Sequence, residues 1–194
     1  MLYKEFLSIV AIILTFVAFI PYIRSIQQGI TKPHVFSWII WASVTFIIFL
    51  AQLSDNAGAG AWPIGISGII TLYVALLAYS KKSDTMITGK DWIFFAAAMS
   101  ALPFWYFTSN PLWAVAILTT VDLIGFAPTF RKAYHYPNEE QLLFFALMAC
   151  RNFISIMALE HYSLTTVLFP AATGLACILF IKLVLIRRTV KQKA

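Results

Sequence analysis

The stretch Phe19-Ile20-Pro21-Tyr22-Ile23-Arg24 recurs later in the chain as Phe126-Ala127-Pro128-Thr129-Phe130-Arg131. The phenylalanine, proline and arginine repeat at one offset (128 − 21 = 107 and 131 − 24 = 107), and Pro63 meets Pro170 at the same offset. Four further identities fall between the proline pairs without a gap, where Ala42, Phe46, Ile47 and Ala51 align with Ala149, Phe153, Ile154 and Ala158. An internal repeat in an apolar chain is typical of transporters, in which two similar halves move about a site held between them.

The composition predicts an all-α integral membrane protein. The chain is 61% hydrophobic and only 11% charged, with a mean hydropathy of +0.83, which leaves too little polar surface for a soluble domain of 194 residues. A helix needs about 20 apolar residues to cross a bilayer. Seven stretches meet this need, at 6–26, 34–53, 59–80, 92–108, 112–132, 140–159 and 163–186.

The loop charges predict the orientation. With seven spans, nearly all basic loop residues fall on one face, and the opposite face holds Lys4 beside Glu5, Asp55 and Glu160. Short Lys- and Arg-rich loops stay cytoplasmic, so we expect the N-terminus outside and the C-terminus in the cytoplasm, in the inner membrane if the source is bacterial. The net charge of +6 is explained by insertion and by anionic lipid, and requires no nucleic-acid partner.

The repeat and the orientation together predict a 3+1+3 plan. An offset of 107 residues includes four crossings, so the fifth span runs in the same direction as the first and the two repeats are parallel. Residues 1–80 form the first three-helix unit, 81–110 hold a linker helix, and 111–194 form the second unit with a basic tail.

This plan resembles the SWEET and PQ-loop (MtN3-like) transporter superfamily. The resemblance is carried by residues 19–28 in the first unit and 122–131 in the second, and extends over nearly the whole chain. The namesake Pro-Gln pair is replaced by Pro21-Tyr22 and Pro128-Thr129. Ile64 and Ala171 stand where sugar-transporting SWEETs usually carry an asparagine. The resemblance therefore implies the fold and a transport function, but not a sugar substrate.

Paired prolines are candidate hinges. We expect Pro21, Pro63, Pro128 and Pro170 to lie inside helices, where a proline removes a hydrogen bond and kinks the chain. The alternative is static packing, since proline is common in membrane helices. In the resembled family such prolines are implicated in bending during alternating access.

Asp122 and Arg151 are the strongest candidate site residues. Each follows a long apolar run, and a charge at mid-membrane costs at least ~2.5–3.5 kcal/mol unless it is paired or faces a polar cavity. Asp122 would lie ~15 Å and Arg151 ~12 Å below the same face, so a salt bridge between them is geometrically available. The pair is then either an architectural lock or part of a transport cavity in which Arg151 binds an anionic group. The Asp-x-x-Gly segment at Asp122 also resembles the proton-coupling position of cystine-type PQ-loop exporters, which implies a proton site.

The remaining candidates are uncharged. At the repeat offset Asp122 corresponds to Thr15 and Arg151 to Val44, so the charges lie in the second unit only. The polar groups of the first unit that we expect near a site are Thr15, Ser43, Thr45 and Ser67. Asn152 either faces the site or bonds a neighbouring helix. Trp38 and Trp41, one turn apart, either wall a cavity or pack between helices, and Cys150 and Cys177 are expected to be buried small residues.

The sequence thus predicts a secondary transporter of a small polar or anionic solute, with proton coupling through Asp122. The alternative is a non-transporting receptor on the same fold, like the KDEL-type retrieval receptors, binding a carboxylate through Arg151. No nucleophile with a base, metal-ligand spacing or phosphate-binding loop is present, so we expect no enzyme activity, cofactor or metal. Expected partners are a small-molecule substrate and the lipid bilayer. A homo-oligomer is left open, because one chain already holds both halves of a path.

Overall fold

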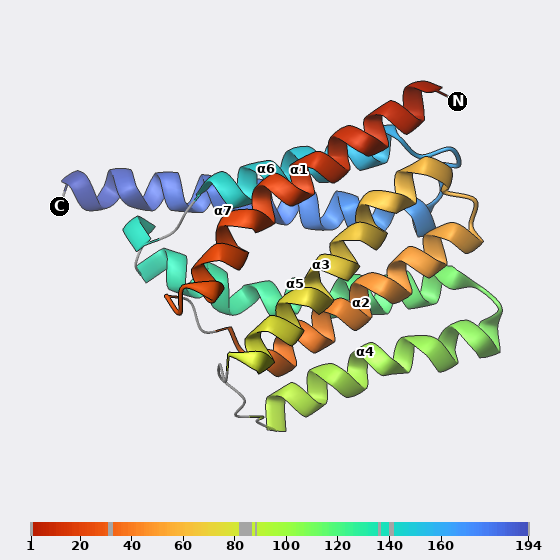
Figure 1. Cartoon of the computed structure of the whole chain (residues 1–194), viewed down its shortest axis with the longest axis horizontal. Helices are drawn as coiled ribbons and strands as arrows, with labels where there is room; N and C mark the ends of the chain where they lie inside the picture. The colour runs from red at the N-terminus through yellow and green to blue at the C-terminus, as the bar shows by residue number, and fades with distance from the viewer. Residues whose placement is uncertain are drawn as a thin grey trace.

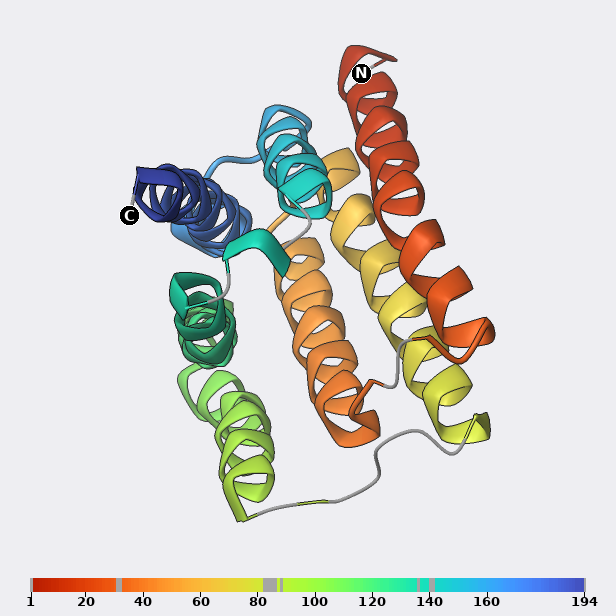
Figure 2. The same cartoon turned by 90° about the vertical axis from the view of Figure 1, so that its left-hand side faces the viewer.

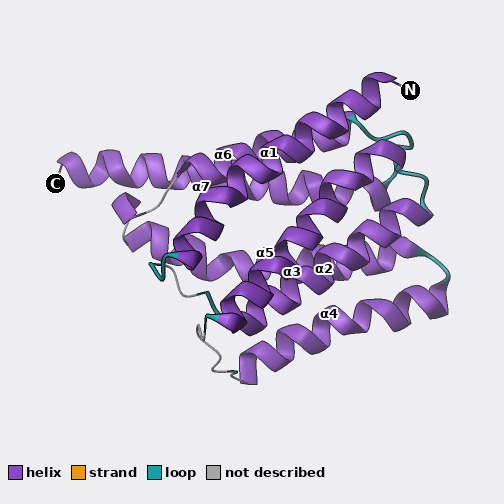
Figure 3. Ribbon diagram, viewed as in Figure 1, coloured by secondary structure: helices purple, strands orange, loops and turns teal. Residues whose placement is uncertain are grey.

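The computed structural model describes residues 2–30, 33–81, 87, 89–135, 137–139 and 142–193, without the side chains at 90, 127, 128, 131, 132, 139 and 191–193. This part of the chain is helical throughout and contains no strand (Figure 3). Its α-helices are α1 (Leu2–Gln27), α2 (Val35–Ser54), α3 (Trp62–Ser80), α4 (Gly89–Thr108), α5 (Pro111–His135), α6 (Leu142–Met157) and α7 (Leu164–Lys193). Two short 3-10 helices, η1 (Gly58–Ala61) and η2 (Pro137–Glu139), precede α3 and α6. The predicted all-α class is confirmed, and a helix covers most of each predicted apolar stretch.

Four helical segments are long and apolar enough to cross a membrane: Leu2–Gln27, Val35–Ser54, Gly58–Ser80 and Leu164–Val190. Pro111–Phe126 and Leu142–Met157 are apolar but shorter. Large apolar side chains such as Phe6, Ile93 and Phe153 stand exposed on the outside of the bundle. These features are those of a multi-pass membrane protein, because such a surface is stable only against lipid.

We describe the helices as two groups, α1–α3 and α5–α7, with α4 between them in the sequence. In the first group α3 packs against both α1 and α2, and in the second α7 packs against both α5 and α6. Figure 2 shows α3 (yellow) between α1 (red) and α2 (orange). Between the groups, α1 lies against α6 and α2 lies against α5, while α4 packs on α5 and α2. The largest buried cluster, which includes Ile48, Ala98, Val115 and Leu118, lies where α2, α4 and α5 meet.

The helix connections lie at two opposite ends of the bundle. The N-terminus and the α2–α3, α4–α5 and α6–α7 connections lie at one end, on the right of Figure 1, and the C-terminus lies at the other. We refer to these as the N-terminal end and the C-terminal end.

The prolines differ in their helical positions. Pro21, Pro103 and Pro170 lie inside α1, α4 and α7, and α5 continues through residue 128, whose side chain is outside the described set. The prediction of a helix-interior position is wrong for Pro63, which is the second residue of α3. A proline in the first turn costs no helical hydrogen bond, because the N–H groups there have no helical acceptor.

Candidate functional site

Arg151 is the centre of a buried hydrogen-bond cluster that joins three helices. Its side chain lies on α6 and is 2% exposed. Nε donates to Thr15 Oγ1 on α1 at 3.3 Å, and one terminal nitrogen donates to the Pro63 carbonyl on α3 at 2.9 Å. The other terminal nitrogen donates to Asn152 Oδ1 at 2.5 Å. The guanidinium group therefore connects the second helical group to both α1 and α3 of the first.

The expected salt bridge between Arg151 and Asp122 is absent. Both residues are described, and no nitrogen of Arg151 lies within 4.0 Å of an oxygen of Asp122. Arg151 instead contacts Thr15, the residue that corresponds to Asp122 in the first repeat. Position along the helices does not specify which face of α5 carries Asp122.

Asn152 bonds a neighbouring helix, as one of its two predicted alternatives required. Its amide nitrogen donates to Thr173 Oγ1 on α7 at 3.1 Å, and Thr173 donates to the Phe169 carbonyl at 2.8 Å. Close approach makes this contact possible, because a Cβ on Gly174 would lie only 3.3 Å from Asn152 Cβ. Asn152 thus accepts from Arg151 and ties the cluster to α7, even though adjacent helix positions point in different directions.

Asp122 lies on α5 and is partly buried. No hydrogen bond or ion pair joins it to any described residue. One turn further along α5, a Cβ on Gly125 would be 3.7 Å from the indole nitrogen of Trp41. Asp122 therefore lies near the line where α2 and α5, from different groups, pack together.

Trp38 and Trp41 form an aromatic cluster on α2. Their rings meet edge to face with centroids 5.3 Å apart, and Trp38 also stacks on Tyr22 at 5.2 Å. Phe19 packs on Trp38 and on Phe144, which belongs to α6. These contacts link α1, α2 and α6 on the C-terminal side of the Arg151 cluster, and favour packing between helices as one role of the tryptophans.

The other first-unit candidates are not brought to Arg151. Ser43 and Thr45 donate to the carbonyl groups of Ile39 and Trp41 within α2. Ser67 is buried on α3, one turn beyond Pro63, and its hydroxyl group makes no hydrogen bond to Arg151 or Asn152. The cysteines also differ from expectation, because Cys177 is buried but Cys150 is exposed on the surface of α6.

Sequence reasoning missed Gln52 as a cross-helix contact. Gln52 is fully buried on α2, and its amide nitrogen donates to the Thr166 carbonyl on α7 at 2.7 Å. Thr166 lies four residues before Pro170, so the proline leaves this carbonyl without its helical donor. The sequence signals were a glutamine inside an apolar stretch and a proline inside another. Pairing them requires the knowledge that α2 and α7 approach each other.

The N-terminal end is closed by contacts between the α2–α3 and α6–α7 connections. The backbone N–H of Glu160 donates to the Ala57 carbonyl at 3.0 Å, and Nδ1 of His161 lies 3.0 Å from the Asp55 carbonyl oxygen. Ser163 also donates to the Asp55 carboxylate. Gly60 makes this approach possible, because a Cβ there would lie within 2.8 Å of the Leu159 backbone. We call this set the loop–loop contact.

Within the described residues, no three His, Cys, Asp or Glu side chains gather as metal ligands. The sequence matches no protein-family model, and comparisons with curated proteins and with solved structures give no match either. The features that indicate a function are therefore those of the Arg151 cluster.

Proposed function

We propose that this chain is a secondary transporter that moves a small polar or anionic solute by alternating access between two three-helix units. The unit 1 helices are α1–α3, the unit 2 helices are α5–α7, and α4 is the linker of a seven-span 3+1+3 plan. The helix contacts support this plan, because the main contacts of one unit have counterparts in the other. The α1–α3 and α2–α3 contacts correspond to α5–α7 and α6–α7, and the α1–α6 contact corresponds to α5–α2. The short helix α6 then requires local thinning of the bilayer or a tilt of its neighbours.

The observation that carries the proposal is the buried positive charge of Arg151. It lies between the two units, is 2% exposed, and has no carboxylate partner among the described residues. An uncompensated buried charge is costly, and its three neutral partners leave N–H groups of the guanidinium free. An anionic group of a substrate would supply the missing charge through a bidentate contact.

The inaccessibility of Arg151 in this conformation supports alternating access. Arg151 is nearly inaccessible, so a solute reaches it only when the units separate. At the N-terminal end the loop–loop contact holds them together. By the positive-inside rule this end faces the outside of the cell, so the conformation is closed to the outside.

Asp122 is the proposed proton site. Its carboxyl group lacks a hydrogen-bond partner among the described residues and lies where the units meet, near Trp41. A carboxylate in that position exchanges a proton with whichever side the units open to, and so couples solute movement to a proton gradient.

The first experiment identifies the solute and measures its flux. The purified protein is screened for thermal stabilisation by sugars, amino acids, nucleosides, vitamins and carboxylates, and any stabilising solute is followed into proteoliposomes. We expect saturable uptake of an anionic or zwitterionic solute, lost in Arg151→Gln. Uptake of that solute by Arg151→Gln at the wild-type rate would contradict the role of Arg151.

Asp122→Asn tests proton coupling. An imposed pH gradient drives accumulation in the wild-type protein, and we expect the variant to lose this accumulation but to keep exchange of labelled for unlabelled solute. Exchange needs no net proton movement, so it controls for correct folding. Gradient-driven accumulation that survives in Asp122→Asn would exclude this residue as the proton site.

A receptor that binds a carboxylate without moving it is the second candidate. The same unneutralised Arg151 favours it. Saturable binding that requires Arg151, combined with flux no greater than in protein-free liposomes, would favour the receptor over the transporter.

A further inference from the structure

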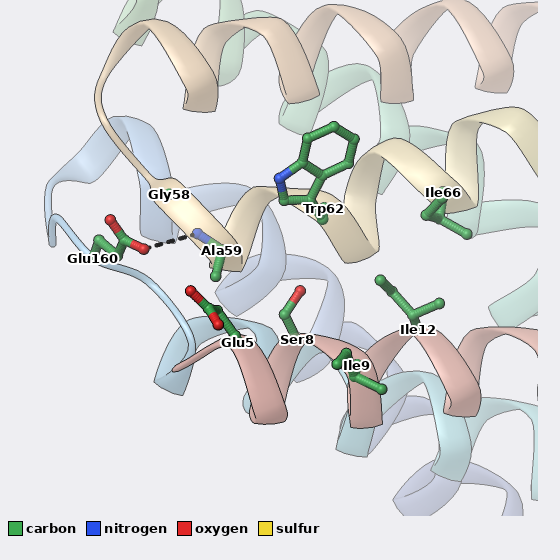
Figure 4. A pocket seen from close by; sticks show the side chains of 9 residues that line it. All are labelled: Glu5, Ser8, Ile9, Ile12, Gly58, Ala59, Trp62, Ile66 and Glu160. Carbon is green, nitrogen blue, oxygen red and sulfur yellow. Dashed lines mark hydrogen bonds between the residues drawn. The ribbon is translucent and has the colours of Figure 1, made fainter. Parts of the chain in front are cut away.

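The structure holds a second candidate site, separate from the Arg151 cluster, between α1 and the start of α3. It is an open pocket with a volume of about 490 Å³, within the range of small-molecule sites. Its residues come from α1, from η1 and α3, and from the α6–α7 connection (Figure 4). None of the residues that line it hydrogen-bonds to Arg151.

The two ends of the pocket differ in chemistry. Glu5 and Glu160 lie at one end, and Ile9, Ile12 and Ile66 extend from there along α1 and α3 (Figure 4). Neither carboxylate has a cationic partner among the described residues. The nearby cation is engaged elsewhere, because Lys4 donates to the Leu159 carbonyl and lies over the Tyr162 ring.

Ser8 supplies an independent indication of a ligand. Its side chain is 4% exposed, points into the pocket (Figure 4), and has no hydrogen-bond partner among the described residues. The hydroxyl group faces the pocket, so a ligand that carries a donor can reach its oxygen.

Glu5 and Glu160 are both exposed, and contacts with η1 position the Glu160 carboxylate. The backbone N–H of Ala59 donates to its carboxylate at 3.4 Å, and a Cβ on Gly58 would lie 2.1 Å from the carboxyl carbon. Gly58 also has a φ of +61°, a conformation that favours glycine. The chain therefore brings this carboxylate against the rim of the pocket.

We propose that this pocket binds an alkylammonium group, with the ammonium between Glu5, Glu160 and Ser8 and the alkyl chain along the isoleucines. An ammonium has several N–H donors and a positive charge, which match two carboxylates and a hydroxyl oxygen. Two kinds of molecule could supply this ammonium group: the aminoethyl headgroup of phosphatidylethanolamine, or a free cationic amphiphile. The proposal does not rest on the proposed transport function, although Glu160 belongs to both the pocket and the loop–loop contact.

The test is native mass spectrometry of the purified full chain in an uncharged detergent. Decylammonium, decanol and decanoate share one alkyl chain and differ in the headgroup. We expect one bound decylammonium and little decanol or decanoate, with binding about tenfold weaker in the double variant Glu5→Gln, Glu160→Gln. Binding of decanol as tight as that of decylammonium, or unchanged binding in the double variant, would overturn the proposal.

A matched pair of variants locates the alkyl chain. Ile9 lines the pocket and Ile13 does not, yet their side chains are similarly exposed, at 56% and 54%. We expect Ile9→Trp to abolish decylammonium binding and Ile13→Trp to preserve it. Equal effects of the two substitutions would place the ligand elsewhere.

To distinguish a lipid from a free amphiphile as the source of the ammonium group, phosphatidylethanolamine or phosphatidylglycerol is added to the same sample and its retention is measured by native mass spectrometry. Retention of phosphatidylethanolamine alone, lost in the double variant, identifies a lipid headgroup. Decylammonium binding without selective phosphatidylethanolamine retention identifies a free amphiphile. Absence of both kinds of binding overturns the proposal.

Discussion

At the scale of single residues, Arg151 is the feature with the largest energetic consequence. Its hydrogen bonds to Thr15, Asn152 and the Pro63 carbonyl go to neutral groups, so they orient the charge without neutralising it. A membrane-buried cation without an anion is stabilised less than a paired one. Arg151 is therefore oriented to bind an anionic partner. A substitution that places a carboxylate beside it would supply such a partner.

Thr15→Asp supplies an internal anion. We expect it to stabilise the protein by about 1–3 kcal/mol, because a hydrogen bond between charged groups replaces a neutral one, and to reduce binding of an anionic solute. Equilibrium denaturation with sodium dodecyl sulfate in mixed micelles measures the free energy of unfolding, and the stabilisation screen measures the binding.

Thr119→Asp is the matched control for this substitution. Thr119 is also a buried threonine, on α5, but its hydroxyl group has no partner among the described residues. Unlike Thr15, Thr119 accepts no hydrogen bond from a described cation, so we expect a loss of about 2 kcal/mol or more. If Thr15→Asp destabilises the protein as much as Thr119→Asp, Arg151 already has a counter-charge. The proposal that an anionic solute neutralises Arg151 then fails.

At the scale of helices, Pro170 and Gln52 form one functional unit across α7 and α2. The proline frees the Thr166 carbonyl, and Gln52 satisfies it at 2.7 Å. The oxygen of this amide, Gln52 Oε1, is buried and has no hydrogen-bond partner among the described residues. The contribution of Gln52 therefore comes from its amide N–H donor. The carbonyl group freed by the interior proline of α7 depends on this donor from a helix of the opposite unit.

A double-mutant cycle tests this dependence. Gln52→Met should cost about 1–2 kcal/mol of unfolding free energy, because the Thr166 carbonyl is left buried and unsatisfied. In a Pro170→Ala background the restored N–H of residue 170 bonds that carbonyl, so the same substitution should cost about 1 kcal/mol less. The same denaturation assay applies.

Pro103→Ala provides the comparison for this cycle. Pro103 also lies inside a helix, but Gln52 does not bond the carbonyl that it frees. We expect Gln52→Met and Pro103→Ala to be additive. Equal coupling of Gln52 to both prolines would mean that its role is general packing and not the repair of α7.

How much the sequence could predict depends on whether a feature is local. Apolar stretches predicted the helices, because their length and composition are properties of continuous chain. Arg151 and Asp122 stood out because a charge in an apolar run needs an explanation. Which residues they contact depends on helix rotation, so the salt bridge was predicted wrongly. Pro63 was also misplaced, since the 3-10 turn before α3 has no counterpart in the apolar pattern.

At the scale of the whole molecule, the two ends of the bundle are held by different chemistry. The loop–loop contact joins the units at the N-terminal end through hydrogen bonds of Asp55, Glu160 and Ser163. Toward the C-terminal end, contacts between the two units include the packing of Phe19 on Phe144. Hydrogen bonds between small polar groups can break one at a time and be replaced by water. Such a contact is suited to opening and closing.

Cross-linking the loop–loop contact tests whether the units separate at that end. In a Cys150→Ser, Cys177→Ala background, cysteines at positions 55 and 163 are bridged by a bifunctional methanethiosulfonate, which forms a disulfide with each thiol, releases methanesulfinate, and can be removed by reduction. We expect flux to fall to the level of protein-free liposomes and to recover on reduction, because the solute can no longer enter from the N-terminal end. Each single-cysteine variant should keep its flux under the same treatment.

The decisive control is a bridge inside one unit. Arg187 lies 4.0 Å over the Tyr134 ring and donates to the Tyr134 carbonyl, so cysteines at these two positions join α5 to α7 within unit 2. If each unit moves as a rigid body, this bridge should leave flux intact, while the bridge between positions 55 and 163 stops it. Flux that persists with positions 55 and 163 fully bridged would rule out separation of the units at the N-terminal end. Flux stopped equally by both bridges would show that unit 2 itself deforms, and the prolines inside its helices would then be the first positions to test.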